Sequence, residues 1–218
     1  MNWKKRVTSL VLAVCLLAGM LPTMAFATET PRAEKKTSVA GMPFTDVEAG
    51  SWYSDAVQYV YDNKLMNGMT ATTFEPDTPM NRAMLVTVLW RMAGSPAAQG
   101  NGGFTDLRAD WYRQAAVWGA QNGIVSGTSR TTFAPDKAVT KEQACALLAR
   151  FARTRGVQAA ADAAPVYVAE CSAWAGSDVQ SAYALGIADS YAACLAAPQA
   201  SATRAELAHM LSDLLQRV

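Results

Sequence analysis

Three basic residues occupy one repeated position in the chain. Arg82, Lys141 and Arg204 each follow an Asn or Thr that can begin a helix, and each stands at the same offset after a tryptophan. The first turn of a helix offers unbonded N–H groups and the positive end of the helix dipole, so a cation is unexpected there and a carboxylate is favoured. The pattern predicts that these residues bind an acidic ligand, and a solvated helix start is the alternative. The planar fork of arginine recognises carboxylates more specifically than lysine does, so Lys141 should bind less specifically.

Aromatic residues and glycines recur at fixed distances from these cations. The tryptophans at the start of the pattern, Trp52, Trp111 and Trp174, offer flat apolar faces with one N–H, which suits contact with a sugar ring. Packing of the same three side chains in a core is an equally open interpretation. Gly68 and Gly127 follow the first two tryptophans at matching positions, and glycine allows a backbone to come close to a ligand.

These positions belong to three copies of one unit, aligned without a gap from the tryptophan to the basic residue. Residues 104–152 form the clearest copy. Repetition at such a period is typical of units that stack on one another. Each copy predicts a helix, a loop and a second helix. The first helix should begin near the tryptophan, with Ser51 and Asp110 as caps, and Gly123 and Gly186 suit the turn after it.

The second helix of each copy has a clear start and one apolar face. Thr140 with Gln143, and Thr203 with Glu206, have the spacing of capping boxes, and Asn81 stands at the matching position. Apolar residues then recur at the spacing of a single buried face. One helix pair cannot bury that face alone, so we expect an all-α fold in which three helix-loop-helix repeats form a pseudo-three-fold bundle. An open solenoid is the alternative.

The composition divides the chain into a leader, a tether and the repeats. A basic start followed by a short apolar run and small residues predicts a signal peptide at 1–27, and a polar tether at 28–42. An uncleaved membrane anchor is disfavoured because the apolar run is shorter than the ~20 residues that a spanning helix needs. The predicted repeats are 43–94, 104–156 and a divergent third at 166–218. They are separated by a flexible linker at 95–103 and a stiffer one at 157–165.

Charge and cysteine content exclude several kinds of function. The chain has 19 basic and 18 acidic residues, and cleavage of the leader removes three basic ones, which leaves a net charge of −2. A nucleic-acid footprint is therefore absent. No Cys or His spacing indicates a metal site or a cofactor. Cys171 and Cys194 could form a disulfide within the third copy, but together with Cys145 they could equally be small buried residues.

The repeated motifs resemble the S-layer homology (SLH) repeat over nearly all of the mature chain. The shared motifs are Phe-x-Asp, Trp-Tyr, a glycine loop, Phe-x-Pro-Asp and Thr-Arg-Ala-Glu. In this sequence they stand at Phe44-Thr45-Asp46, Trp52-Tyr53 and Phe74-Glu75-Pro76-Asp77, at Phe104-Thr105-Asp106, Trp111-Tyr112 and Phe133-Ala134-Pro135-Asp136, and at Thr203-Arg204-Ala205-Glu206.

The resemblance implies a pseudo-trimer whose inter-repeat grooves bind a secondary cell-wall polysaccharide, often one that carries ketal-linked pyruvate. It also implies that Arg82, Lys141 and Arg204 meet the acidic sugar. The first copy departs from the pattern with Met84 in place of the capping glutamate. The third copy lacks the aspartate, glycine and phenylalanine of its loop, and has Ala169, Ser190 and Ala196 instead. We therefore expect unequal grooves.

A non-catalytic binder of wall polysaccharide, secreted to the surface of a Gram-positive-type cell, is the function that the sequence favours. No Ser/His/Asp set is visible, and His209 is the only histidine. The acidic residues stand at equivalent turn positions in the repeats, which favours a structural role over that of paired glycosidase carboxylates. A helical scaffold that binds another surface protein is the alternative, and the oligomeric state is left open.

Overall fold

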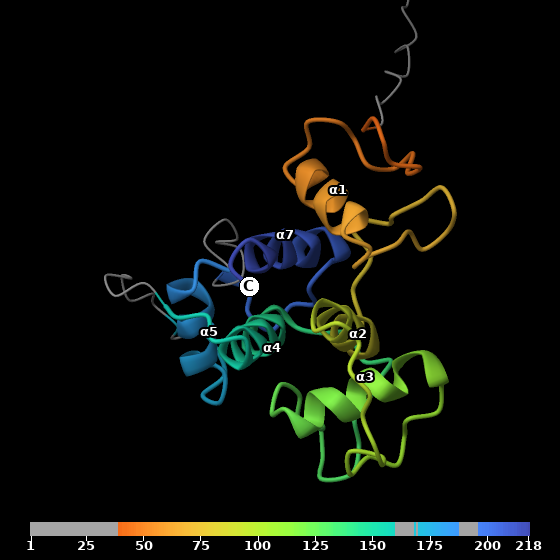
Figure 1. Cartoon of the computed structure of the whole chain (residues 1–218). Helices are drawn as coiled ribbons and strands as arrows, with labels where there is room; N and C mark the ends of the chain where they lie inside the picture. The colour runs from red at the N-terminus through yellow and green to blue at the C-terminus, as the bar shows by residue number, and fades with distance from the viewer. Residues whose placement is uncertain (1–38, 160–167, 169, 188–195) are drawn as a thin grey trace, which may run out of the picture. The chain divides into compact units, whose positions relative to one another are not determined.

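The computed structural model describes residues 39–159, 168, 170–187 and 196–218, and this part of the chain is helical (Figure 1). The all-α prediction is confirmed. Its helices are α1 (Ser54–Asp62), α2 (Arg82–Met92), α3 (Asp110–Gln121), α4 (Lys141–Thr154), α5 (Gly176–Ala184) and α7 (Arg204–Leu215). The predicted leader 1–27 and most of the predicted tether lie outside the described residues, as does Cys194. None of the helices in the described ranges is both long and apolar enough to cross a membrane.

The first helix of each copy packs against the second helix of the copy before it. The packed pairs are α3 on α2, α5 on α4, and α1 on α7 (Figure 1). Among the second helices, α4 contacts both α2 and α7. The contact between α1 and α7 joins the first copy to the last. The arrangement is therefore closed, as predicted, and the open solenoid is excluded for this part of the chain.

A ring of backbone hydrogen bonds relates the three copies. Met80, Val139 and Ala202 occupy equivalent positions shortly before the second helices. The N–H of Met80 donates to Ala202 O (3.0 Å), that of Val139 to Met80 O (2.9 Å) and that of Ala202 to Val139 O (2.8 Å). Each copy thus donates to one neighbour and accepts from the other. The third copy completes this pseudo-three-fold ring although its loop sequence has diverged.

The second helices begin as the sequence predicts. The side chains of Asn81, Thr140 and Thr203 accept hydrogen bonds from the third helical N–H, at 2.9, 3.3 and 3.3 Å. In the last two copies the side chains of Gln143 and Glu206 accept in return from the cap N–H. These bonds satisfy donors that a helix start otherwise leaves unbonded. The predicted capping boxes are confirmed.

The first helices begin differently from the prediction. α1 starts at Ser54 and α3 starts at Asp110. In neither helix does the side chain of the preceding residue accept a hydrogen bond from the first-turn N–H groups. Ser51 was expected to cap α1, but its buried hydroxyl has no hydrogen-bond partner among the described residues, and its carbonyl accepts from Ser54 N instead. Asp110 is the first helical residue rather than the cap, so both predictions are wrong. The phenol oxygen of Tyr112 accepts from the two N–H groups before α3, a cap that comes from inside the helix.

The apolar faces of the helices form one core. On the second helices the predicted residues are buried, apart from a half-buried Met92: Leu85, Val88 and Leu89, then Ala144, Leu147, Leu148 and Phe151, then Leu207, Met210, Leu211 and Leu214. Gly123 and Gly186 adopt the predicted left-handed conformation after their helices, with φ of +66° at both. Lys64 takes that conformation in the first copy, with φ of +59°.

The segment 95–103 is held against the helices, in contrast to the flexible linker that its composition predicted. The indole N–H of Trp90 donates to Pro96 O at 2.8 Å, and Gln114 Oε1 accepts from the N–H of Ala98, a buried residue, at 2.8 Å. Gln121 Nε2 also donates to Gln99 O. Side chains from α2 and α3 therefore replace the solvent that would otherwise bind this backbone.

Asp178 connects α5 to α4 through two arginines. Its buried carboxylate accepts from Arg150 Nε (2.9 Å) and Nη2 (2.6 Å), and from Arg153 Nη2 (2.5 Å). Charge-assisted hydrogen bonds in partly buried settings are among the stronger ones in proteins.

We expect Asp178→Asn to lower the free energy of unfolding by about 2 kcal/mol, because it weakens bonds between charged groups at a buried position. Urea denaturation measures this change. Asp110→Asn is a matched control, since the Asp110 side chain is 98% exposed and its pair with Arg113 is a surface contact that should contribute little. Equal effects of the two substitutions would contradict this account of α5.

Candidate functional site

Two of the three predicted cations are buried and hold the loop of the next copy. The guanidinium of Arg82 donates from Nε to Phe133 O (2.8 Å) and from Nη2 to Ser126 O (2.6 Å), and it lies 4.9 Å from the centre of the Phe133 ring. Only 5% of Arg82 is exposed. Arg82 belongs to the first copy and both carbonyls belong to the second, so the side chain fastens one copy to another.

Arg204 repeats this arrangement from the third copy to the first. Its Nε donates to Phe74 O (2.7 Å) and its Nη2 to Asn67 O (2.7 Å), and the guanidinium lies 4.4 Å from the centre of the Phe74 ring. Burial lowers the pKa of both arginines, and the carboxylates of Asp106 near Arg82 and of Glu75 and Asp46 near Arg204 oppose that shift. In the described part of the chain no partner contacts Nη1 of either arginine, so each guanidinium keeps one donor group for a ligand.

Lys141, the third predicted cation, has a different surrounding. It is also buried, and its Nζ lies 3.0 Å from Glu206 Oε1, a carboxylate of the third copy. The two side chains form an ion pair between α4 and α7. The three positions that the sequence treats as equivalent are therefore not electrostatically equivalent.

The three predicted tryptophans are exposed, which argues against the core interpretation. Trp52, Trp111 and Trp174 are 59, 53 and 51% exposed. Soluble proteins rarely leave several large aromatic side chains open to water at related positions unless the surface binds something. Each of these side chains exposes part of a flat apolar ring on which a ligand can pack.

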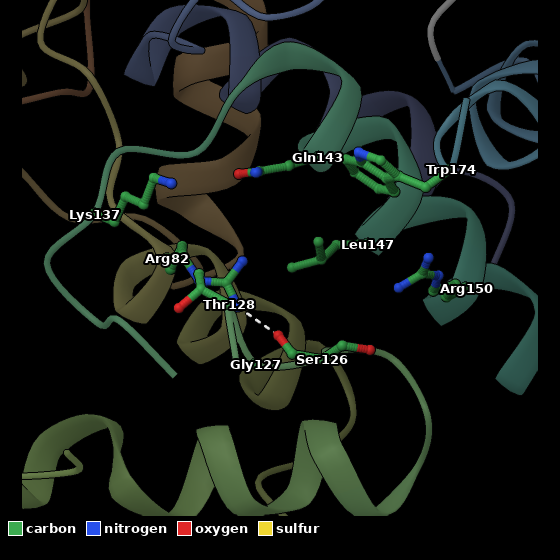
Figure 2. A pocket seen from close by; sticks show the side chains of 9 residues that line it. All are labelled: Arg82, Ser126, Gly127, Thr128, Lys137, Gln143, Leu147, Arg150 and Trp174. Atoms are coloured by element: carbon green, nitrogen blue, oxygen red, sulfur yellow. Dashed lines mark hydrogen bonds between the residues drawn. The ribbon is translucent and has the colours of Figure 1, made fainter. Parts of the chain in front are cut away.

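Arg82 and Trp174 meet at a groove that we call groove 1 (Figure 2). It has a volume of about 330 Å³ and is lined by Arg82, Ser126, Gly127, Thr128, Lys137, Gln143, Leu147, Arg150 and Trp174. The first copy contributes the arginine, the second copy the loop and the face of α4, and the third copy the tryptophan. Figure 2 shows the basic groups of Arg82 and Lys137 at one end, Arg150 at the other and Leu147 between them.

A second, smaller groove, groove 2, repeats this pattern around Arg204. It has a volume of about 80 Å³ and is lined by Leu65, Met66, Asn67, Met80, Met84, Thr87, Val88, Arg91, Trp111 and Arg204. Met84, Val88 and Arg91 stand at the repeat positions of Gln143, Leu147 and Arg150 in groove 1. The same three-copy construction therefore appears twice: in groove 2 the third copy contributes the arginine, the first copy the loop and the face of α2, and the second copy the tryptophan.

Sequence reasoning missed the residues that the second helix adds to each groove. Gln143, Leu147 and Arg150 of groove 1 stand at fixed offsets after Trp111, and their counterparts in groove 2 stand at the same offsets after Trp52. These offsets can be found in the sequence, but the buried residues of the same helix also recur at fixed offsets. Repetition alone therefore does not distinguish residues that line the groove from residues of the core. Lys137 precedes the helix and has no basic counterpart in the first copy, where Thr78 stands at its position.

Gly127 lines groove 1, yet the loop itself requires both predicted glycines. A Cβ added to Gly127 would overlap Ser129 O and would lie 2.6 Å from Thr132 O. At Gly68 it would overlap Thr70 O and lie 2.5 Å from Thr73 O and from the ring of Phe44. The two glycines are thus needed for the loop to fold back on itself, whether or not a ligand comes near.

Asp46 and Asp106 hold the loops, as predicted for turn residues. The carboxylate of Asp106 accepts from Phe133 N (2.8 Å) and Ala134 N (2.7 Å), and Asp46 accepts from Phe74 N and Glu75 N at the same distances. These bonds orient the same Phe133 and Phe74 carbonyls that receive the arginines. Partial burial raises the pKa of Asp106, but the two backbone N–H groups and the charge of Arg108 outweigh it and hold that pKa below its usual value.

A carboxylate whose pKa is lowered by folding stabilises the protein above its unfolded pKa, near 3.9, and loses that contribution as the pH falls through its folded pKa. We therefore expect Asp106→Asn to lower the free energy of unfolding at pH 7, and the difference from wild type to shrink near pH 3. Urea denaturation at the two pH values measures it. A difference of the same size at both would contradict this role of the charge.

The geometry suits binding of an anion beside a flat apolar surface. Within the described ranges, no group of three or more His, Cys, Asp or Glu side chains is placed to hold a metal ion. Cys145 is buried and Cys171 is half-buried, and since Cys194 lies outside those ranges the disulfide stays a prediction.

Comparison with known proteins identifies the first two repeats. The model of the S-layer homology domain matches residues 43–83 and 103–145. The Surface-layer 125 kDa protein of Lysinibacillus sphaericus is 30% identical over 171 residues, 75% of this chain and 14% of that protein. An Endoglucanase of Bacillus sp. (strain KSM-635) is 28% identical over 217 residues, 98% of this chain and 22% of that protein. The S-layer protein of Bacillus licheniformis is 22% identical over 148 residues, 67% of this chain and 15% of that protein. The chain spans less than a quarter of the length of each.

Proposed function

We propose that this chain, an S-layer homology domain protein, is a non-catalytic anchoring module that binds an acidic secondary cell-wall polysaccharide, one that carries pyruvate, through its inter-repeat grooves. The observation that carries the proposal is the twofold occurrence of one construction. In grooves 1 and 2 a buried arginine with one unused donor group, a second arginine and an exposed tryptophan converge from three copies.

The charges of groove 1 favour a carboxylate carried on a sugar ring. Arg82 and Lys137 place two positive charges at one end, where a pyruvate ketal would present its carboxylate to Nη1 of Arg82. The indole of Trp174 offers the apolar face on which a pyranose ring can lie. Because Arg82 is already fixed by two backbone carbonyls, its guanidinium loses little side-chain freedom on binding.

The comparisons favour anchoring over catalysis. The relatives include S-layer proteins as well as glycosidases, and this chain matches only a small part of each. A segment shared by proteins with different activities fits a common attachment role better than a common reaction. A location at the cell surface or in the cell wall follows from the same attachment role.

Co-sedimentation of the purified protein with cell walls tests the proposal. Walls with their acidic polymer intact should retain the protein, and walls from which that polymer has been extracted should not. Equal retention by both would contradict polysaccharide binding and would favour the alternative, a scaffold that binds a surface protein. Release of sugar from the walls during the incubation would contradict a non-catalytic role.

A further inference from the structure

A third set of side chains stands at the repeat positions that build grooves 1 and 2. We call it the third cluster: Trp52, Lys141, Glu206, His209 and Asp213. Lys141 matches the buried arginine of each groove, and Trp52 matches the tryptophan. Glu206 and Asp213 stand at two positions of the second helix that are occupied by Gln143 and Arg150 in groove 1 and by Met84 and Arg91 in groove 2.

The side chains of the third cluster lie together on one face of α7. Lys141 Nζ is 3.0 Å from Glu206 Oε1, and His209 Nδ1 is 3.5 Å from Asp213 Oδ2. The ring of His209 stacks on Trp52 with 6.0 Å between centres and 28° between planes. The cluster therefore brings a cation and an exposed indole to the same face of α7, as grooves 1 and 2 do on their helices, but with two carboxylates added.

Glu206 and Asp213 make these two helix positions acidic, whereas the same positions in groove 1 are neutral and basic. In groove 1 the matching residues are neutral and basic, so Arg82, Lys137 and Arg150 dominate, with Asp178 bound to the last of them. In the third cluster the carboxylate of Glu206 pairs with Lys141, and that of Asp213 lies beside His209. Glu206 already pairs its carboxylate with the cation that an acidic sugar would have to reach.

We propose that the third cluster rejects the acidic ligand and that Glu206 and Asp213 are the residues that decide this, so the chain binds acidic sugar only at grooves 1 and 2. An approaching carboxylate would compete with Glu206 for Lys141 and would be repelled by Asp213. The inference rests on the proposed function, and deepens it by assigning which repeat junctions bind.

The double variant Glu206→Gln and Asp213→Arg tests the inference, because it gives the third cluster the groove 1 residues at these two positions. The helix start should survive, since Gln143 makes the same reciprocal bond with Thr140 that Glu206 makes with Thr203. The indole N–H signals of Trp52, Trp111 and Trp174, assigned through single Trp→Phe variants, report the three junctions separately by NMR. The probe is a methyl hexoside that carries a 4,6-linked pyruvate ketal.

In the wild type, we expect the Trp111 and Trp174 signals to move with probe concentration and the Trp52 signal to stay. In the double variant all three should move. The inference is overturned if Trp52 moves as Trp174 does in the wild type, or if it stays in a variant whose other two signals respond normally. If no indole responds in either protein, the proposed function fails, and the inference falls with it.

Discussion

Trp174→Ala should weaken binding to cell walls roughly 30-fold, because truncation of a tryptophan at the centre of a binding site costs ~2 kcal/mol or more, and every 1.4 kcal/mol is a factor of ten. The residue lines groove 1 and is 51% exposed, so its loss removes ligand contact without opening the core. Sedimentation isotherms with intact walls give the dissociation constants. Thermal unfolding should show that the variant keeps the stability of the wild type.

Trp52→Ala is the matched control, since it is the same truncation at an equivalent position that is 59% exposed. It should leave wall binding close to wild type, because the third cluster carries Glu206 and Asp213. Trp111→Ala, in the smaller groove 2, should fall between the two. Equal losses for all three would contradict the unequal grooves that we derive from their charges.

Arg82→Lys should lower the free energy of unfolding by about 3 kcal/mol even though it keeps the charge. Lysine cannot bond both carbonyls that the fork of Arg82 reaches, and a buried carbonyl that loses its partner costs ~1–3 kcal/mol. The contact with the Phe133 ring is weakened as well. Urea denaturation measures the change, with Arg130→Lys, at an exposed position of the second copy, as control.

A change of less than about 0.5 kcal/mol, the range of ordinary surface substitutions, would contradict this structural role. The prediction also affects how binding data should be read. A loss of wall binding in an Arg82 variant can come from a loosened loop, so the tryptophan variants test ligand contact more cleanly.

The internal register of the repeats made much of the fold predictable. Capping boxes and apolar faces depend on neighbours within one helix, so Thr140, Thr203 and the stripe of α4 could be assigned from spacing alone. Ser51 and Asp110 were misassigned as caps, and in α3 a phenol from within the helix, that of Tyr112, binds the N–H groups before the helix instead. A search for polar residues just before a helix does not find an acceptor that lies inside the helix.

The partners between copies could not be predicted. Equal offsets show that Arg82 and Trp174 are equivalent to residues in the other copies, but not that they meet across a loop of the second copy. The packing of α1 on α7 rather than on α2 likewise depends on how the chain closes on itself, which the spacing within each copy does not determine. Exposure of the tryptophans decided between core and surface, which sequence spacing left open.

The third copy shows how a divergent sequence keeps its place in the fold. Glu142, at a position where the other copies have alanine, accepts from the N–H of Ser172 (2.9 Å) and from its hydroxyl (2.8 Å). Gln199 Nε2 donates to Glu170 O at 2.9 Å, and Asp178 binds the arginines of α4. These contacts are peculiar to this junction, and they fasten the third copy to the second and to itself.

Retention by untreated walls and by walls whose pyruvate has been removed with mild acid tests the central claim most directly. The wild-type protein should sediment with untreated walls and remain in solution with treated ones, and Lys137→Glu, which reverses a charge in groove 1, should weaken retention by untreated walls. Arg130→Glu, the same charge change on an exposed residue outside the groove, should not. Undiminished retention of the wild type by the treated walls would contradict recognition of the acidic sugar.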